Sequence, residues 1–527
     1  MTSPIDTSLP AGWTVAAIEE VADLNPPLDA AADVDETTVS FVPMAAVEAQ
    51  TGTIDLSRIR RLAEVRKSYR HFQERDVLFA KITPCMENGK MAVVPRLVHR
   101  HGFGSTEFHV LRPHREIDSD YLYGFVSSAR FRRDAERHMT GAVGQRRVPT
   151  SYLALHRVPI PPAQEQRRIA AKIDELFSEL ERGVESLQSA YDQLTAYRQA
   201  VLKRAFEGAL TAQWRQENKD KLEIRDQLIQ RIGQEQNVRY EQALREWRSA
   251  VETGVPANRM GRRPSKPKKP DEPPRVGADE LAELPPLPHG QVYTYLANVG
   301  QLERGTSKHR PRNDPGLFGG PYPFIQTGEV RAADRVIRDH VRTYNELGLA
   351  QSRLWPKGTL CITIAANIAE TAFLGFDACF PDSVVGFTAA ETLVLPRYVE
   401  LFIKSVRTRL EAYAPATAQK NINLSVLERL VIPLCSLQEQ RAVLDRLEAI
   451  LSVVNEQMWV IERAFRSADA LRQSILRKAF TGRLVKQDAN DEPASALLSR
   501  IRAERDQTAK CETLRTSNPR KTAKASA

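Results

Sequence analysis

Residues 161–210 read PPAQEQRRIAAKIDELFSELERGVESLQSAYDQLTAYRQAVLKRAFEGAL, and this stretch decides the fold. Two prolines end an extended segment, and more than forty residues then follow without another proline. Apolar residues recur three or four positions apart, which is the seam of a coiled coil with one four-residue stutter. The seam residues are Ile169, Ile173, Leu176, Leu180, Val184, Leu187, Tyr191 and Leu194. Such a seam exposes an apolar stripe, so this predicted helix needs a partner helix.

The same chain supplies that partner. Gln438 to Leu484 repeats Gln164 to Leu210 at a constant offset of 274 residues and without a gap. The sequence QEQR therefore occurs twice, at Gln164 and at Gln438. The seam recurs at Val443, Leu447, Ile450, Val454, Met458, Ile461, Phe465 and Ala468. We infer that the chain is a tandem duplication.

A globular module precedes each long helix. The sequences LPAGW at Leu9 and LPHG at Leu287 open the two modules. β-branched and aromatic residues predict strands in each module, and apolar periodicity predicts one helix in each. The predicted strands are Val39–Val42, Asp76–Ala80, Tyr322–Gln326 and Gly358–Ile364, and the predicted helices are Tyr121–Arg137 and Val399–Tyr413. We expect two mixed α/β (α+β) domains of about 150 residues each, which is a usual domain size.

The repeat unit is a globular domain followed by a long helix. GQRRVPTSYLALHRVPIP from Gly144 aligns at the same offset with AQKNINLSVLERLVIPLC from Ala418. Leu228–Glu235 also resembles Leu497–Glu504, which predicts a short amphipathic docking helix after each repeat, or else two unrelated charged helices. The expected segments are a first domain at 1–160, a first helix at 161–212, a charged helix and Pro/Lys linker at 213–285, a second domain at 286–433, a second helix at 434–485, and a docking helix with a basic tail at 486–527.

Composition indicates a soluble globular protein rather than a membrane or disulfide-rich one. No run is apolar enough to span a membrane, and the first residues lack the apolar core of a signal peptide, so we expect a cytoplasmic protein. The segments Asn258–Gly277 and Ser499–Ala527 each carry a net charge of +5, so the rest of the chain is near −1 and the total is +9. Any DNA binding by the globular domains must therefore use local patches.

No self-contained active site is evident, and we expect neither a catalytic residue nor a metal or cofactor in this chain. Asn25-Pro26-Pro27-Leu28 is similar to the NPP loop of amino-methyltransferases, but Leu28 replaces the aromatic residue that would stack on a flipped base. A turn explains these residues better. The five cysteines form no close pair, which argues against a zinc cluster.

The duplicated layout resembles the specificity subunit of type I restriction–modification enzymes. The resemblance covers nearly the whole chain and is carried by FVPMAAVEAQTG from Phe41, DVLFAKITPCMENGK from Asp76, YPFIQTGEV from Tyr322 and both QEQR helices. It implies two target recognition domains, each reading half of a bipartite asymmetric DNA site. It also implies two long antiparallel coiled-coil helices, related by a pseudo-twofold axis, as a spacer.

The same resemblance implies the partners. Two methyltransferase subunits and the restriction (translocase) subunits would bind this non-catalytic subunit on double-stranded DNA, and those subunits would carry the AdoMet, ATP and Mg chemistry. A specificity module of a methylation-only or other phage-defence complex fits the sequence equally well. A coiled-coil protein scaffold is a rival from another class, but it does not explain the α/β domains.

Candidate DNA contacts follow from side-chain chemistry, since amides and cations read base edges and phosphates. Lys81, Thr83, Asn88 and Lys90 lie on a strand–loop segment, which could instead be a solvated hairpin. Gln145, Arg146 and Arg147 stand at repeat-equivalent positions to Gln419, Lys420 and Asn421, where a turn with surface charge is the alternative. Ser307, Lys308 and Arg310 form a basic loop that fits either phosphate contact or solubility.

Overall fold

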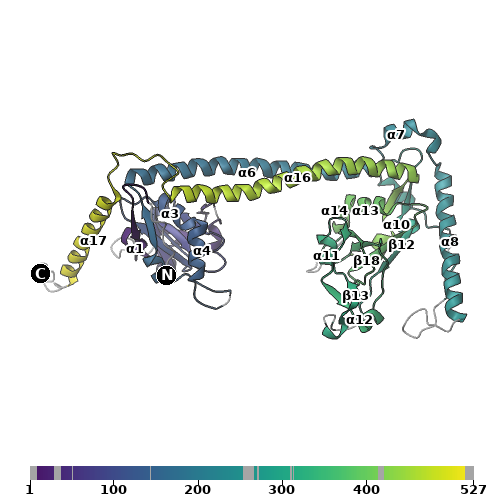
Figure 1. The fold of residues 1–527 in the computed structure, drawn as a ribbon, viewed down its shortest axis with the longest axis horizontal. Coiled ribbons are helices and arrows are strands. Elements are labelled where there is room, and N and C mark those ends of the chain that lie inside the picture. The colour runs from purple at the N-terminus through teal and green to yellow at the C-terminus, as the bar shows by residue number, and fades with distance from the viewer. Residues whose placement is uncertain are drawn as a thin grey trace. The chain divides into compact units, whose positions relative to one another are not determined.

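The computed structural model describes residues 9–28, 37–49, 51–142, 144–252, 266–269, 272–308, 311, 314–412 and 421–516. The chain forms two compact units (Figure 1). The first unit comprises residues 1–189 and 461–527, and the second comprises residues 190–460. Each unit contains one globular module and one part of each long helix, α6 (Ala163–Phe206) and α16 (Leu437–Ala479).

The first module is a mixed α/β domain. Its strands are β1 Thr14–Ala17, β2 Ala22–Leu24, β3 Thr38–Val42, β4 Ile59–Arg61, β5 Arg70–Gln73, β6 Val77–Ala80, β7 Met91–Val93, β8 His101–Gly104, β9 Phe108–Pro113 and β10 Arg157–Ile160. Its helices and 3₁₀ turns are α1 Ile18–Val21, η1 Met44–Ala46, α2 Leu62–Val65, η2 Val98–Arg100, α3 Ser119–Ser127, α4 Ala129–Arg137 and α5 Thr150–Leu155. The sheets have the orders β2-β9-β6-β7, β4-β3-β8-β5 and β1-β10.

Strand β6 shows why this module forms. All four residues of β6 are buried, as a continuous apolar run predicts. Val77 and Phe79 belong to one hydrophobic cluster with residues of α3 to α5, whereas Leu78 and Ala80 belong to another with residues of the β4-β3-β8-β5 sheet. Because side chains alternate along a strand, the sheet that contains β6 is covered on both faces.

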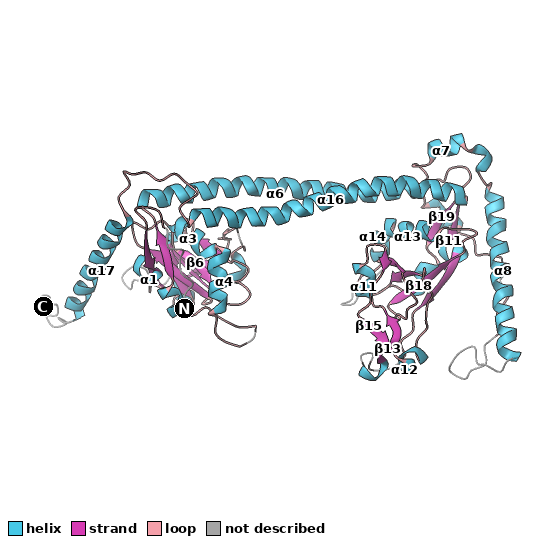
Figure 2. Cartoon of the chain, in the orientation of Figure 1, coloured by secondary structure: helices cyan, strands magenta, loops and turns pink. Residues whose placement is uncertain are grey.

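The second module repeats this plan with changes (Figure 2). Its strands are β11 Val292–Tyr295, β12 Gly300–Arg304, β13 Phe318–Phe324, β14 Val336–Ile337, β15 Arg342–Tyr344, β16 Leu360–Thr363, β17 Thr371–Leu374, β18 Val384–Ala389 and β19 Val431–Leu434. Its helices and 3₁₀ turn are α9 Ala278–Ala282, α10 Leu296–Val299, η4 Pro315–Leu317, α11 Thr327–Ala332, α12 Glu346–Ala350, α13 Pro396–Ser405, α14 Arg407–Ala412 and α15 Leu424–Glu428. The sheets have the orders β12-β18-β16-β17-β14, β13-β15 and β11-β19.

The register of the paired edge strands confirms the duplication. Thr14 pairs with Ile160 in the first module, and Val292 pairs with Leu434 in the second. Ile160 and Leu434 stand at the offset of the long-helix repeat. The predicted strands are also confirmed, as β3, β6, β13 and β16, with ends shifted by a few residues.

The prediction of one continuous helix over Tyr121–Arg137 is wrong. The structure has two helices, α3 and α4, because Ser128 adopts extended backbone angles (φ −63°, ψ 142°). The Ser128 hydroxyl accepts a hydrogen bond from the Phe131 backbone N–H at 3.3 Å and caps the second helix. The helix predicted at Val399–Tyr413 is likewise divided, at Val406, into α13 and α14.

The two long helices pair as an antiparallel coiled coil within each unit. Ile169 and Ile173, near the start of α6, share a cluster with Leu476, near the end of α16. In the second unit, Leu202, near the end of α6, shares a cluster with Leu447, near the start of α16. The predicted seam residues of both helices are buried or half-buried.

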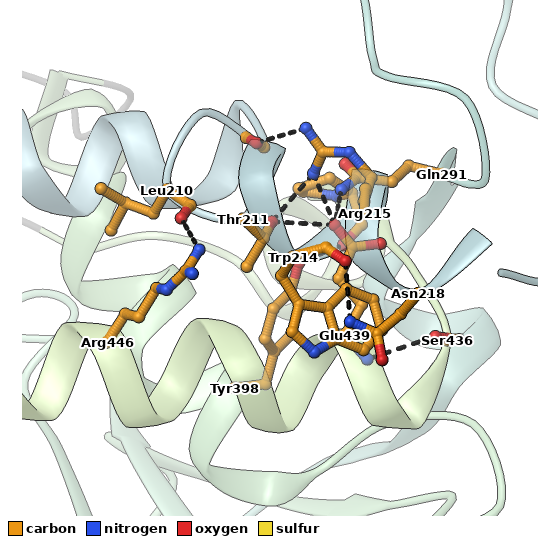
Figure 3. Close-up of polar contacts among 12 residues, drawn as sticks. Leu210, Thr211, Trp214, Arg215, Asn218, Gln291, Tyr398, Ser436, Glu439 and Arg446 are labelled. Carbon is orange, nitrogen blue, oxygen red and sulfur yellow. Dashed lines mark hydrogen bonds and ion pairs between the residues drawn. The ribbon is translucent and has the colours of Figure 1, made fainter. Parts of the chain in front are cut away.

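A buried carboxylate fixes the start of α16 to the second module (Figure 3). Glu439 accepts hydrogen bonds from Thr211 Oγ1 at 2.8 Å and Gln291 Nε2 at 2.8 Å, and Arg215 Nη1 forms an ion pair with it at 2.6 Å. The next residue, Gln440, accepts a hydrogen bond from the Leu395 N–H at 2.9 Å. We call this group of contacts the second helix junction.

The first module has a corresponding junction at the start of α6. The Trp13 indole donates to Glu165 at 3.1 Å, and Gln166 accepts a hydrogen bond from the Asp118 N–H at 2.9 Å. Trp13 and Gln291 occupy the same place in LPAGW and LPHGQ, so both copies of QEQR serve one structural purpose. Burial raises the pKa of Glu165, which lacks an arginine equivalent to Arg215 at hydrogen-bond distance among the contacts of the described residues.

Each long helix also ends against the opening turn of a module. Gly208 follows α6 with φ +76°, and a Cβ there would lie 2.6 Å from Cγ of Pro288. Gly482 follows α16 with φ +67°, and a Cβ there would lie 2.2 Å from Cγ of Pro10. Glycine at both sites therefore permits the left-handed backbone and the close approach.

Helices are present at both predicted docking segments. After α7 (Ala212–Glu217) and the turn η3 (Lys219–Lys221), helix α8 (Arg225–Glu252) contacts α10, and helix α17 (Ala494–Thr516) contacts α1. Leu228 and Ile232 of α8 are buried, as are Leu497 and Ile501 of α17. Helix α8, which follows the first repeat, thus packs on the second module, and helix α17, which follows the second repeat, packs on the first module. Among the described residues, no helix combines the length and apolar character needed to cross a bilayer.

Candidate nucleic-acid interface

Two predicted segments of the first module meet where β6 ends. The Val148 N–H donates to the Lys81 carbonyl at 2.9 Å, and the Thr83 N–H donates to the Arg146 carbonyl at 3.0 Å. The loop of residues 81–90 therefore lies beside residues 144–147, although about 55 residues separate them in the chain. We call these two segments the strand-end loops of the first module.

The two arginines of these loops have different environments. Arg147 forms a forked ion pair with Glu107, with distances of 2.9 Å from Nε and 2.8 Å from Nη2. This hydrogen bonding lowers the pKa of Glu107 and raises that of Arg147. Arg146 lies farther from carboxylates, at 3.9 Å from Glu87 and 3.8 Å from Glu136. Arg146 is therefore freer to turn toward a nucleic acid than Arg147, whose donors are already engaged.

The remaining predicted residues of the first loop also differ in their contacts. The Asn88 side chain is exposed, and the Thr83 hydroxyl donates to Glu87 at 2.8 Å. Lys90 donates from Nζ to the Val47 carbonyl at 3.0 Å and to the Met44 carbonyl at 3.3 Å, so it holds the loop in place. Burial lowers the pKa of Lys81, with the Glu107 carboxylate acting in the opposite direction.

The NPP segment lies at the same end of the sheet and forms a turn. Asn25 has φ +52°, and its side chain accepts a hydrogen bond from the Val110 N–H of β9 at 3.0 Å. The Asn25 amide also lies 3.3 Å from Nδ1 of His109, whose Nε2 lies 2.8 Å from the Val148 carbonyl. Burial lowers the pKa of His109 to about 4, so the imidazole is neutral at pH 7 and links the turn to the strand-end loops.

The second module builds the same arrangement with other side chains. The Ile422 N–H donates to the Ile364 carbonyl at 2.9 Å, and Asn421 bridges to Ala365 just as Arg147 bridges to Ile82. Residues 364–370 and 421–422 are the strand-end loops of the second module. Residues 364–370, 421 and 422 include no lysine or arginine, but Lys420, which corresponds to Arg146, directly precedes Asn421 and lies outside the described residues. Arg331 reaches the loop of residues 364–370 by donating to the Asn367 side chain at 3.3 Å.

Sequence reasoning missed residues 364–370 and Arg331. The offset between Lys81 and Ile364 is 283 rather than 274, so a search at constant offset does not align the two loops. The shared strand–loop–strand order around β6 and β16 is the signal that could have found them.

Ser307 and Lys308 follow β12 at the same end of the second module's sheet. Arg304, at the end of β12, pairs with Val385, while Thr363, at the end of β16, pairs with Val384. Ser307 is buried and lines a cavity of about 270 Å³ with Gln326, and the Lys308 N–H donates to the Gln351 side chain at 2.6 Å. The predicted contacts Arg310, Gln419 and Lys420 lie outside the described residues.

The first module thus collects cations, amides and hydroxyls at one end of a sheet, and the described loops of the second module present the amides of Asn367 and Asn421 beside Arg331. Such groups can donate to phosphates and base edges. Within the described ranges, no cluster of three or more His, Cys, Asp or Glu side chains is placed to hold a metal ion.

The sequence matches a known family in two regions. Residues 10–187 and 296–458 match the type I restriction modification DNA specificity domain. The chain is 37% identical over 171 residues to the EcoAI specificity subunit of Escherichia coli, an alignment that covers 32% of this chain and 29% of that protein. It is 23% identical over 524 residues to the EcoKI specificity subunit of Escherichia coli (strain K12), covering 94% of this chain and 96% of that protein.

A solved structure has a similar fold. It is described as the structural basis underlying complex assembly and conformational transition of the type I R-M system, and it covers 90% of this chain and 100% of its own, with a TM-score of 0.65 and 19% identity. The two regions of the sequence match together span more than half of the chain. This chain therefore belongs to the type I restriction modification DNA specificity domain family.

Proposed function

We propose that this chain is the DNA-reading subunit of a type I restriction–modification complex and that each module reads one half of a bipartite, asymmetric site. One observation carries the proposal. The two modules build their strand-end loops with the same backbone pairing, Val148 to Lys81 and Ile422 to Ile364, but present different side chains. A common scaffold with different donors and acceptors is what two unlike half-sites require.

Within this proposal the residues have separate roles. Arg146, Asn88, Gln145 and Lys81 of the first module contact DNA, and Asn421, Gln419, Lys420 and the loop of residues 364–370 do so in the second. Thr83, Lys90 and Arg147 position the first loops through Glu87, the Val47 carbonyl and Glu107. Ser307, Lys308 and Arg310 contact the phosphate backbone.

The chain itself supplies recognition and no catalysis. Two methyltransferase subunits and the restriction subunits are its protein partners on double-stranded DNA in the cytoplasm. AdoMet, ATP and Mg belong to those partners. The EcoAI and EcoKI relatives are named as specificity subunits of type I restriction enzymes, which supports this assignment.

Methylome sequencing tests the proposal in cells that express the chain with its methyltransferase partner. Arg146→Ala should relax or weaken recognition at the first half-site only, and Asn421→Ala at the second only. A lost base-edge contact costs about 1–3 kcal/mol at one position, whereas a lost phosphate contact weakens all sequences alike.

Arg115→Ala is the matched control, because Arg115 is exposed in the same module but follows β9 at the end of that strand remote from Phe108 and the strand-end loops. It should leave both half-sites unchanged. Unaltered methylation in an Arg146→Ala, Asn421→Ala double variant, or an altered second half-site in Arg146→Ala alone, would refute the assignment.

A further inference from the structure

The first unit contains a cavity of about 630 Å³ beside α4, α5 and the end of α16. Its apolar side is formed by aromatic rings, with the Phe125 and Phe480 ring centres 5.4 Å apart and those of Phe125 and Phe131 5.5 Å apart. Exposed cationic side chains surround this apolar side: Arg130, Arg133, Arg137, Arg157 and Arg477. Asp134 is the acidic residue in the lining, so the cavity is strongly cationic.

Two buried polar atoms in the cavity lining have no hydrogen-bond partner among the described residues. They are the Tyr152 hydroxyl and Nδ1 of His156. Burial raises the pKa of Tyr152 to about 12 and lowers that of His156 to about 4, so both groups are neutral at pH 7. A neutral phenol and a neutral imidazole are suited to hydrogen bonds with the uncharged backbone of a peptide rather than to pairing with a charged group.

The second unit has an equivalent cavity of about 530 Å³, and the segment that precedes the second module supplies part of its wall. Phe206 and Lys203 stand there in the places of Phe480 and Arg477. Leu284 and Pro285, which precede the opening turn of the second module, also line it, and the Tyr293 hydroxyl donates to the Pro285 carbonyl at 2.8 Å.

The segment that contains Leu284 and Pro285 is acidic, with the sequence ADELAELPP from Ala278. Its Glu280 lies 3.6 Å from the guanidinium of Arg429. In the second unit, the Leu-Pro pair of this acidic segment therefore lies against the cavity, whereas the ion pair of Glu280 with Arg429 lies outside the cavity lining.

The first module has no such pair in the corresponding part of its sequence. Counting back from the opening turns, Leu284 and Pro285 correspond to Asp6 and Thr7, neither of which has an apolar side chain. The first cavity also has more arginines around it than the second has cations in its lining. The sequence at this position of the first module therefore offers no equivalent Leu-Pro pair.

We propose that the cavity of the first unit is a docking site for an acidic peptide segment of a protein partner, with an apolar Leu-Pro-like anchor between the aromatic rings. The arginines pair with its carboxylates, and the anchor excludes water from the rings. This inference does not depend on DNA reading by the strand-end loops.

Fluorescence anisotropy with a fluorescein-labelled ADELAELPP peptide and the full-length chain tests the proposal at about 0.1 M salt. The peptide should bind saturably. Arg133→Glu combined with Arg477→Glu should weaken binding about tenfold, because two exposed ion pairs become repulsive contacts. All substituted side chains are exposed, so circular dichroism should be unchanged.

The second unit offers a matched control. Lys203→Glu combined with Arg409→Glu reverses two exposed charges in the lining of the equivalent cavity and should leave peptide binding unchanged. A peptide with serine in place of each Leu and Pro should bind much more weakly than ADELAELPP.

Three results would overturn the proposal. They are absence of binding, equal binding of the serine peptide, and binding that responds to the second-unit variant instead of the first. If the Arg133→Glu, Arg477→Glu variant instead lost affinity for a labelled random-sequence duplex while no peptide bound, the arginines would serve the DNA backbone and the peptide site would be rejected.

Discussion

Replacing Arg215 should open the second helix junction. Glu439 is 0% exposed, and Arg215 is the cation that neutralises it at 2.6 Å. Arg215→Met leaves the carboxylate with the neutral donors Thr211 and Gln291. An uncompensated buried charge costs about 3–5 kcal/mol. Since each 1.4 kcal/mol is tenfold in an equilibrium constant, local opening should rise by more than about 100-fold.

A double-mutant cycle separates the ion pair from general damage. Glu439→Gln keeps a similar shape and leaves a partly solvated guanidinium, so it should cost about 1–3 kcal/mol through weakened hydrogen bonds. The Arg215→Met, Glu439→Gln double variant contains no unpaired buried charge. It should therefore be less destabilised than Arg215→Met alone, which gives a coupling energy of about 2–3 kcal/mol.

Hydrogen exchange with mass spectrometry across a urea series can measure the free energy of local opening separately in each unit. Peptides from the start of α16 and from β11 report on the second junction, while peptides from the start of α6 and from β1 serve as an internal control in the first unit. The reasoning fails if Arg215→Met changes the free energy of opening at α16 by less than about 1 kcal/mol. It also fails if the double variant is as unstable as the sum of the two single variants.

Four further variants test the packing of the first unit. Burial raises the pKa of Glu165, so the stability contributed by its protonated form is present below the unfolded pKa of 4.5 and is lost as the pH rises through the folded pKa. Glu165→Gln should therefore make the first unit at least as stable as the unsubstituted protein at about pH 8. Lower resistance of the variant to urea at that pH would contradict this reasoning. Gly482→Ala should destabilise the first unit by about 1–3 kcal/mol in urea, because Gly482 has a positive φ and an added Cβ would clash with Pro10. Gly183→Ala should instead stabilise α6 by up to about 1 kcal/mol, because nothing lies within 4 Å of the added Cβ. Deletion from Ala494 onward uncovers the apolar surface that Leu497 and Ile501 bury, worth about 1.5–3 kcal/mol for each side chain, so calorimetry should show a lower Tm for the first unit only.

Much of the fold was predictable because the repeat is visible in the sequence. The seam from Ile169 to Leu194 and its copy at constant offset predicted two long paired helices, and buried runs such as Val77–Ala80 predicted strands. The break at Ser128 was missed because its flanking residues keep a helical apolar period, while a single hydroxyl cap decides the geometry.

The candidate site was less predictable. Residue types in 81–90 and 145–147 indicated a polar surface, but sequence alone does not show that Glu107, 40 residues away from Arg147, occupies its guanidinium. The loop of residues 364–370 was hidden by the change of offset from 274 to 283, since register is inherited along continuous helices but lost across loops of unequal length.

The two glycine–proline contacts give the polypeptide a cyclic order. The end of α6 meets the turn that opens the second module at Pro288, and the end of α16 meets the turn that opens the first at Pro10, where the Ala494 N–H also donates to the Gly12 carbonyl at 2.9 Å. The end of each repeat therefore contacts the start of the other repeat. A gene rearranged to begin at Leu287, continue through α17 by a flexible linker into Leu9, and stop after α8 would encode every one of these contacts. The order in which the two halves are translated is thus open to evolutionary change while the protein they build stays the same.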